Sequence, residues 1–244
     1  MSMLDGEVIV VTGASRGLGR SMAERFSREG ATVTLTARNE ERLAEVARGL
    51  PGESLVAPAD VRNANAVDRV IERTVDAFDG LDTLVNNAGV SILGMQDSRK
   101  QLVEVTEEEW DTVLGVNLKG VFLFTRAALP HLYASGHGNV LNVSSGLGRH
   151  AVAGAGAYVS SKWGLEGLTR VTALEAEEDG VNANALDPGG RVNTDIWAHL
   201  PEEERAQILQ PDVMDEAAVL LAAQGPDGVT GESMTAAEWE GRLG

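Results

Sequence analysis

The sequence predicts an α/β protein of one domain, residues 1–244, built on a doubly wound parallel sheet of about seven strands flanked by helices. Short apolar runs alternate with amphipathic stretches along most of the chain, which is typical of parallel strands covered on both faces. A glycine-rich segment at 12–19 joins the first apolar run to the first amphipathic stretch, as in sheets of this topology. With 43% hydrophobic residues, a chain of 244 residues can bury one sizeable core.

The period of the apolar residues predicts the individual elements. Short apolar runs predict buried strands at 7–12, 31–36, 54–57, 83–85, 139–143 and 181–186. Apolar residues at helical spacing predict helices at 21–29, 40–48, 64–78, 107–133 and 157–178. Thr106 and Glu109 form a capping box for the long helix, and Pro130 is expected to bend its end. Two irregular stretches, 91–105 and 189–215, exceed the usual connection length and are expected to be functional loops.

The charge balance excludes two broad classes of partner. The chain has 37 Asp and Glu against 20 Lys and Arg, for a net charge of −17. Such a surface repels nucleic acid phosphates and anionic membranes, so neither is expected as a partner. The carboxylate excess, with lysine only at Lys100, Lys119 and Lys162, has two interpretations: an ordinary solvated acidic surface, or adaptation to a salt-rich (halophilic) cytoplasm.

The two interpretations differ in their salt dependence. Carboxylates that repel one another until they are screened make the folded state more stable as salt is added. Under salt adaptation, the melting temperature should rise from low to molar KCl. A flat or falling melting temperature would reject salt adaptation.

The composition also indicates which metal and disulfide sites the protein can form and where in the cell it is expected. Cysteine is absent, which excludes disulfides and thiolate zinc sites. The four histidines show no metal-ligand spacing, so no metal site is expected; they are His131, His137, His150 and His199. No run approaches the roughly 18 apolar residues of a membrane helix, and residues 1–7 lack a basic start and an apolar signal core. A soluble, cytoplasmic protein is expected.

The turn at 12–19 indicates a dinucleotide site. Gly13, Gly17 and Gly19 let the backbone approach a pyrophosphate, and the following helix N-terminus supplies N–H groups and positive potential. The alternative is a purely structural strand-to-helix turn. The candidate cofactor residues of this turn are Gly13, Ser15, Arg16, Gly17, Leu18 and Gly19.

The end of the second predicted strand favours NADP(H) over NAD(H), which stays possible. The chain there reads Thr36-Ala37-Arg38-Asn39, without the carboxylate that NAD sites typically offer to the ribose. Arg38 can pair with the additional phosphate of NADP, and Arg16 adds a second cation. The alternative is that both are exposed arginines without a ligand.

Tyr158 and Lys162 are the candidate reacting groups. At positions i and i+4 they share one helix face, where the ammonium is expected to favour the phenolate of a tyrosine whose ordinary pKa is about 10. Ser145, thirteen residues before Tyr158, is expected to hydrogen-bond the substrate oxygen. An oxidised nicotinamide nearby would favour the phenolate further.

Together these motifs resemble the short-chain dehydrogenase/reductase family, which has a Rossmann fold. The resemblance covers roughly residues 6–235, in the family's order. Besides the residues above, it depends on Asp60-Val61, 86–89, Asn117 in 116–120, and 184–189.

The resemblance implies a role for each matched residue. Asn117, Ser145, Tyr158 and Lys162 would form the catalytic tetrad, with Asn117 disturbing its helix so that a backbone carbonyl holds a water leading to Lys162. The resemblance places Asp60 and Val61 at the adenine, Asn87, Ala88 and Gly89 at the adenosine side, and Pro188, Gly189, Val192 and Thr194 at the nicotinamide. Tyr158 and Lys162 would also contact the cofactor, with Lys162 on the nicotinamide ribose. The family assembles through the helices at 107–133 and 157–178, which implies a homotetramer or a homodimer.

The chain departs from the family pattern in four segments. The segment 89–104 is several residues longer, and 190–194 has one residue more than usual. The run 195–210 allows only a small substrate lid. Residues 230–239 lack the usual terminal Asp-Gly-Gly.

The expected function is that of an NADP(H)-dependent ketoreductase, which interconverts a carbonyl and a secondary alcohol in a small molecule. One alternative is an NAD-dependent alcohol or sugar dehydrogenase. Another, from a different class, is a nucleotide-sensing protein without turnover.

Overall fold

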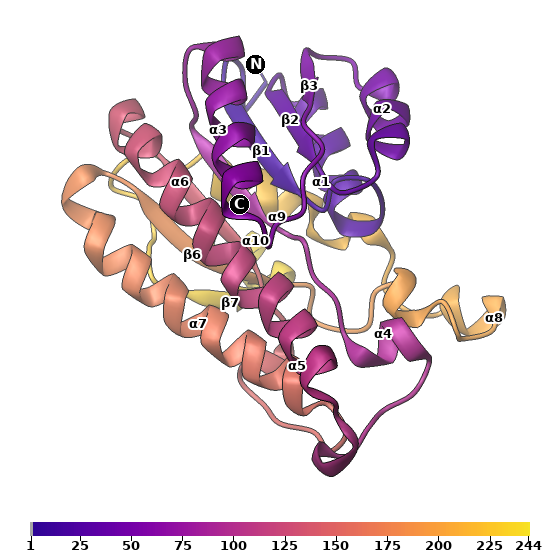
Figure 1. Ribbon diagram of the computed structural model, residues 1–244. Helices are drawn as coiled ribbons and strands as arrows, with labels where there is room; N and C mark the ends of the chain where they lie inside the picture. The colour runs from indigo at the N-terminus through magenta and orange to yellow at the C-terminus, as the bar shows by residue number, and fades with distance from the viewer. Residues whose placement is uncertain (1) are drawn as a thin grey trace.

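A seven-stranded parallel sheet forms the centre of the computed structural model, which describes residues 2–244 (Figure 1). The strand order is β3-β2-β1-β4-β5-β6-β7, so the predicted doubly wound fold is confirmed. The strands are β1 (Val8–Thr12), β2 (Thr32–Thr36), β3 (Ser54–Val56), β4 (Thr83–Asn86), β5 (Asn139–Val143), β6 (Asn182–Asp187) and β7 (Ser233–Thr235). The three-residue β7 has no counterpart among the predicted strands.

Helices cover both faces of the sheet. One apolar cluster lies under α1 (Gly17–Arg28), α2 (Glu40–Gly49), α9 (Asp215–Ala222) and α10 (Ala236–Leu243). A second lies under α3 (Ala64–Phe78), α6 (Gly120–Ser135) and α7 (Gly156–Ala176), which lie side by side in Figure 1. Burial on both faces extends to polar strand residues such as Thr34 in β2 and Asn184 in β6.

The long predicted helix is interrupted in its middle. The capping box of Thr106 and Glu109 opens α5 (Glu107–Leu114), and α6 continues past Pro130 to Ser135. Between them, Gly115–Lys119 forms a π-helical turn. Within residues 2–244, Glu107–Ser135 is the one helix long and apolar enough to cross a membrane by length and composition. Its buried side chains, Phe124 and Leu132 among them, belong to the sheet-facing core, which accounts for this composition.

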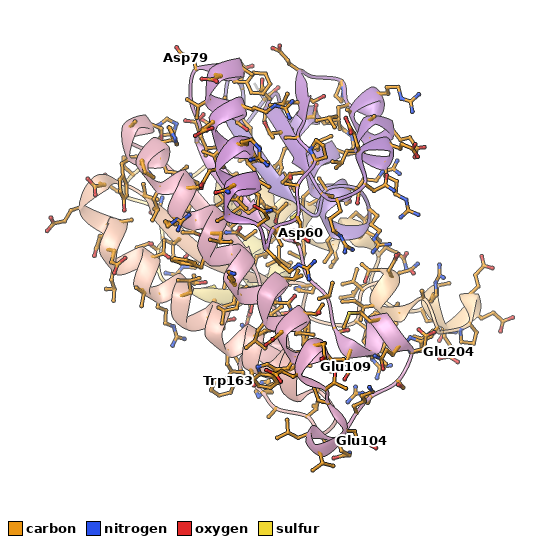
Figure 2. All side chains as sticks on the ribbon, in the orientation of Figure 1. Asp60, Asp79, Glu104, Glu109, Trp163 and Glu204 are labelled. Atoms are coloured by element: carbon orange, nitrogen blue, oxygen red, sulfur yellow. The ribbon has the colours of Figure 1, made fainter. Side chains whose placement is uncertain are left out.

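Acidic side chains point outward from several elements. Figure 2 shows Asp79, Glu104 and Glu204 at the periphery of the molecule, and all three are exposed. The three residues lie far apart in the sequence, so the negative charge is distributed over the surface.

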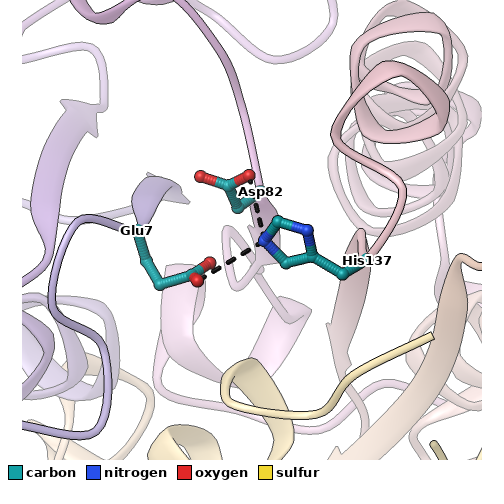
Figure 3. A group of neighbouring side chains, drawn as sticks. All are labelled: Glu7, Asp82 and His137. Atoms are coloured by element: carbon teal, nitrogen blue, oxygen red, sulfur yellow. Dashed lines mark ion pairs between the residues drawn. The ribbon is translucent and has the colours of Figure 1, made fainter. Parts of the chain in front are cut away.

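A three-residue ionic group joins separate segments at the amino edge of the sheet (Figure 3). The His137 Nε2 atom lies 3.5 Å from Glu7 Oε1 and 3.4 Å from Asp82 Oδ1. His137 Nδ1 contacts the Ser135 carbonyl oxygen at 2.9 Å, and the Val8 N–H donates to Asp82 Oδ2 at 2.9 Å. The ligand atoms of the three side chains lie within 4.8 Å of one another. Sequence spacing does not indicate this group, because its members come from three distant segments.

Replacing Glu7 in this group by glutamine is expected to raise the melting temperature at pH 7. Burial, and secondly the Asp82 charge, raise the pKa of Glu7 above its ordinary value of 4.5, and Glu7 Oε2 is buried without a hydrogen-bond partner. Because the pKa of Glu7 is higher in the folded than in the unfolded protein, the free energy of unfolding is greatest below the unfolded-state pKa. It falls as the pH rises through the folded-state pKa. Glu7→Gln removes this loss, for a rise of roughly 2–4 °C per kcal/mol recovered. Calorimetry should find the difference at pH 7 and none below pH 4.

Glu53→Gln is the matched control, because Glu53 is exposed and its replacement should leave the melting temperature unchanged. A lower melting temperature for Glu7→Gln at pH 7 would mean that the ion pair with His137 outweighs the cost of burying the carboxylate.

Candidate active site

The candidate active site lies at the carboxyl edge of the sheet, next to the reversal of strand order between β1 and β4, where sheets of this kind bind ligands. Helix α7 begins at Gly156 and carries Tyr158 and Lys162 in its first two turns. Ser145 lies two residues after the end of β5, at the start of a 3-10 turn. Helix α7 and the loop after β5 thus bring the three predicted reacting residues together.

Direct contacts fix these side chains. The buried Lys162 donates from Nζ to the Val143 carbonyl oxygen at 2.6 Å, and Nζ lies 5.8 Å from the centre of the Tyr158 ring. The Ser145 hydroxyl accepts from the Leu147 N–H at 3.2 Å and hydrogen-bonds the Tyr158 side chain. The phenol therefore lies between a hydroxyl and an ammonium.

The electrostatics differ from the sequence-based expectation. Burial raises the pKa of Tyr158 to about 12; the Ser145 hydrogen bond opposes this rise and Asp187 adds to it. Burial also lowers the pKa of Lys162 to about 8, against the attraction of Glu166 and Asp187. Desolvation dominates this balance, so the expectation that Lys162 lowers the pKa of the phenol is not confirmed, and Tyr158 is protonated at neutral pH.

Asn117 lies within the π-helical turn and is fully buried. Its Oδ1 accepts from the Val90 N–H at 2.8 Å, and its Nδ2 donates to the Val90 carbonyl at 2.9 Å and to Ser161 Oγ at 3.0 Å. The Gly120 N–H bonds to the Gly115 carbonyl, five residues back. The helix is thus distorted at Asn117, as the resemblance implies.

The glycine-rich turn offers an anion-binding helix end. Gly13 and Gly17 adopt φ values of +68° and +55°, which favour glycine. Helix α1 begins at Gly17, has no side-chain cap and carries no acidic residue in its first turn, so its first N–H groups point toward any bound anion. The half-buried Ser15 and Leu18 complete the turn, with Leu18 packed on the core. The residues present fit the pyrophosphate of a dinucleotide.

The end of β4 packs tightly on this turn. Asn87 Nδ2 donates to the Thr12 carbonyl at 2.8 Å, and the Asn87 and Ala88 N–H groups donate to Thr12 Oγ1 at 2.9 and 3.0 Å. A Cβ on Gly19 would lie 2.3 Å from Asn87 Nδ2, so only glycine fits there. A Cβ added at Gly89 would lie 3.7 Å from Asn117 Oδ1. The residues expected to bind the cofactor therefore adjoin those of the expected catalytic tetrad.

At the adenosine side, Asp60 is engaged by a residue that the sequence reasoning missed. The Arg62 guanidinium binds both Asp60 oxygens, with Nε to Oδ1 at 3.0 Å and Nη2 to Oδ2 at 2.6 Å. These hydrogen bonds hold the pKa of Asp60 below its ordinary value, and the Arg38 charge contributes. Val61 is buried against Gly120. Arg62 therefore adds a cation beside Asp60, on which the Arg38 charge also acts; its place two residues after Asp60 was the available signal.

Arg16 has a partner in the opposite wall of the site. Its guanidinium is hydrogen-bonded to Asp195, which belongs to the irregular stretch at 189–215. A Cβ on Gly17 would lie 3.2 Å from Thr194 Cγ2. The predicted nicotinamide segment thus contacts the phosphate-binding turn directly, and Asp195 is a second residue that sequence reasoning missed.

The additional residue in 190–194 is accommodated by a short pairing. Val192 forms an isolated parallel bridge with Leu209, and it is buried. Before it, Gly189 adopts a φ of +82° and its N–H donates to Asp187 Oδ1 at 2.9 Å, while Pro188 is half-buried. This pairing keeps Thr194 next to the glycine-rich turn.

The two irregular stretches meet beside the site. Helix α4 (Ile92–Gln96) packs on the 3-10 turn Asp195–Trp197, where a Cβ on Gly94 would lie 2.9 Å from Ile196 Cα. Figure 1 shows α4 next to the segment that carries α8 (Glu202–Arg205), beyond the edge of the sheet. Both stretches thus form one wall, and Met95 is exposed on it.

Comparison with known proteins gives the family. A family model described as short chain dehydrogenase matches residues 7–205. The dehydrogenase subunit BbsD of Thauera aromatica, which is named for (2S)-[(R)-hydroxy(phenyl)methyl]succinyl-CoA, is 34% identical over 94% of each chain. The 3-oxoacyl-[acyl-carrier-protein] reductase FabG of Thermotoga maritima is 33% identical over 94% of this chain and 95% of its own.

Solved structures agree with these relatives. A metagenomic short-chain oxidoreductase in complex with NADP has a TM-score of 0.82 at 34% identity, with 96% of this chain and 98% of that chain covered. Carveol dehydrogenase from Mycobacterium avium in complex with NAD has a TM-score of 0.87 at 26% identity over 96% and 97%. The protein belongs to the short-chain dehydrogenase/reductase family and is an NAD(P)-dependent oxidoreductase.

Proposed function

We propose that this enzyme is an NADP(H)-dependent reductase that converts a small-molecule carbonyl to a secondary alcohol in the cytoplasm. The observation that carries the proposal is the contact of Ser145 with Tyr158, with the Lys162 ammonium beside the phenol ring. These groups lie at the sheet edge whose helix N-terminus fits a pyrophosphate.

In the proposed reaction, the glycine-rich turn and the N-terminus of α1 would hold NADPH, which would supply a hydride to the carbonyl carbon. Ser145 holds the carbonyl oxygen, and Tyr158, protonated because burial raises its pKa, donates the proton to that oxygen. The Lys162 ammonium stabilises the phenolate that results. The distorted turn at Asn117 offers a backbone carbonyl to a water that resupplies the proton through Lys162.

A panel of ketones and secondary alcohols tests the proposal by the absorbance of the reduced cofactor. NADPH should be oxidised in the presence of at least one ketone. The alternative of a nucleotide-sensing protein predicts cofactor binding with no oxidation by any compound of the panel.

Arg38→Asp is expected to weaken NADPH binding by roughly 10–100-fold, because a phosphate loses its pairing cation and meets a carboxylate. NADH affinity should be kept or increased, since a carboxylate at this position can bind the ribose hydroxyls. Fluorescence titration with both cofactors measures the two affinities.

Arg69→Asp, at an exposed position of α3, is the matched control and should change neither affinity. An unchanged NADPH affinity in Arg38→Asp would favour the second candidate, an NAD-dependent alcohol or sugar dehydrogenase, for which the NAD complex of carveol dehydrogenase is the precedent.

We also propose a homotetramer or homodimer. Helices α6 and α7 expose large apolar side chains, which are Phe122, Trp163, Val171 and Leu174. Exposed apolar patches on helices favour association. Light scattering should give a mass of two or four chains of 25.7 kDa; the mass of a single chain would reject the proposal.

A further inference from the structure

A buried polar cluster lies behind the reacting residues. Glu166 stands one helical turn beyond Lys162 on α7 and is 6% exposed. Its Oε1 accepts from the Ser144 hydroxyl, from the Ser233 hydroxyl at 2.9 Å and from Arg149 Nη1 at 3.4 Å. All three donors converge on this one carboxylate oxygen, which fixes the Glu166 side chain within the cluster.

The second carboxylate of the cluster is Asp187, at the end of β6 and 3% exposed. Its Oδ2 accepts from Arg149 Nη2, and its Oδ1 accepts from the Gly189 N–H. Arg149 also donates to the Ser233 hydroxyl. One guanidinium therefore joins α7, β6 and β7, and it fixes the turn that leads to the expected nicotinamide segment.

The glycines of the 3-10 turn allow this close packing. A Cβ on Gly148 would lie 3.0 Å from both Glu166 Oε1 and Ser144 Oγ. Contacts this short are tighter than most real Cβ contacts, so a larger residue at Gly148 would have to displace the Glu166 or Ser144 side chain. The cluster and the reacting hydroxyls thus share one rigid segment.

The charges of the cluster balance those of the reacting groups. The two cations, Lys162 and Arg149, face the two anions, Glu166 and Asp187, and all lie in or next to a buried region. Burial disfavours the Lys162 ammonium, and the two carboxylates oppose that effect on its pKa. Tyr158 is the other titratable group near Lys162, and Asp187 also acts on it. The π-helical turn contributes one side chain near Lys162. This is the uncharged Asn117, which donates a hydrogen bond to the neighbouring Ser161 on α7.

We propose that Arg149, Glu166 and Asp187 are positioning residues of the reaction: Arg149 holds the two carboxylates, and the carboxylates keep the proton on Lys162 beside Tyr158. The proposal rests on the proposed function, in which Lys162 acts as an ammonium. Ser144, next to the reacting Ser145, serves here as a donor to Glu166.

Direct titration of Lys162 tests the proposal without a substrate. The chain has three lysines, Lys100, Lys119 and Lys162, so protein labelled with ¹³C at the lysine ε-carbon should give three NMR signals, assigned by Lys100→Arg and Lys119→Arg. In Glu166→Gln and in Asp187→Asn, the titration midpoint of Lys162 should move down by about 1 pH unit or more. The signals of Lys100 and Lys119 should not move. An unchanged Lys162 midpoint in both variants would overturn the proposal.

The pH dependence of kcat gives a second readout, which would not change if Glu166 had a purely structural role. In Glu166→Gln, kcat at low pH should equal that of the parent, while the decline of kcat on the alkaline side should begin at lower pH. Glu175→Gln, which removes an exposed carboxylate near the end of the same helix, should keep the parent profile. A uniform loss of kcat at every pH in Glu166→Gln would contradict the proposal.

Arg149 is tested by charge compensation. Arg149→Met leaves two buried carboxylates without their common partner and should lower the melting temperature and kcat. Adding Asp187→Asn to Arg149→Met should recover part of both losses, and no recovery in the double variant would contradict the holding role. If no carbonyl compound is reduced, the proposed function fails, while the NMR titration still decides the state of Lys162.

Discussion

Tyr158→Phe is expected to lower kcat by about 10²–10⁴-fold, the range that a positioned proton donor contributes. The phenol is the protonated group that Ser145 contacts, and burial keeps its proton in place at neutral pH. NADPH affinity should stay within a few-fold of the parent, because the phenylalanine ring fills the same space. Stopped-flow turnover and fluorescence titration measure the two quantities separately.

Tyr133→Phe is the matched control, since Tyr133 and Tyr158 are the two tyrosines of the chain. Tyr133 lies on α6, and its pKa is raised by burial too, but it has no place in the proposed chemistry. Its variant should keep full turnover. A Tyr158→Phe enzyme as active as the Tyr133→Phe enzyme would eliminate Tyr158 as the acid.

Lys162→Met is expected to reduce kcat/KM by about 10³-fold and to weaken NADPH binding as well. The variant removes the cation that stabilises the phenolate, leaves the Val143 carbonyl without its donor, and leaves Glu166 and Asp187 short of one positive charge. Because the pKa of Lys162 is about 8, the parent enzyme should lose activity as pH rises through that value. Circular dichroism confirms that the variant is folded before its kinetics are compared.

Lys119→Met is the control for Lys162→Met, because Lys119 is exposed at the end of the π-helical turn. It should leave kcat/KM and the pH profile unchanged. Parent-like activity in Lys162→Met would show that the ammonium is dispensable for the proton transfer.

Local sequence patterns were sufficient to predict most of the fold. Almost all residues of β1, β2, β4, β5 and β6 are buried because helices cover both faces of the sheet, and short apolar runs between helical stretches can be recognised without coordinates. The strand β7 was not predicted, because its three residues, Ser-Met-Thr, form no apolar run. The π-helical turn at Asn117 breaks no apolar pattern, so it followed only from the family resemblance.

The parts of the site that escaped prediction depend on contacts between distant residues. Arg149 and Asp187 are 38 positions apart, and Arg16 and Asp195 are 179 apart, so no spacing rule relates them. The raised pKa of Tyr158 depends on burial, a property of the assembled fold. The pair Tyr158 and Lys162 could be recognised from the sequence because both residues lie on one turn of α7.

The central claim is that a hydride passes from the reduced cofactor to a carbonyl carbon at this site. Its most direct test uses NADPH stereospecifically deuterated at C4 of the nicotinamide, with a ketone that the enzyme reduces, and NMR of the product alcohol. The account predicts that the deuterium is found on the carbinol carbon of the product. Deuterium absent from that carbon, with solvent hydrogen in its place, would contradict it.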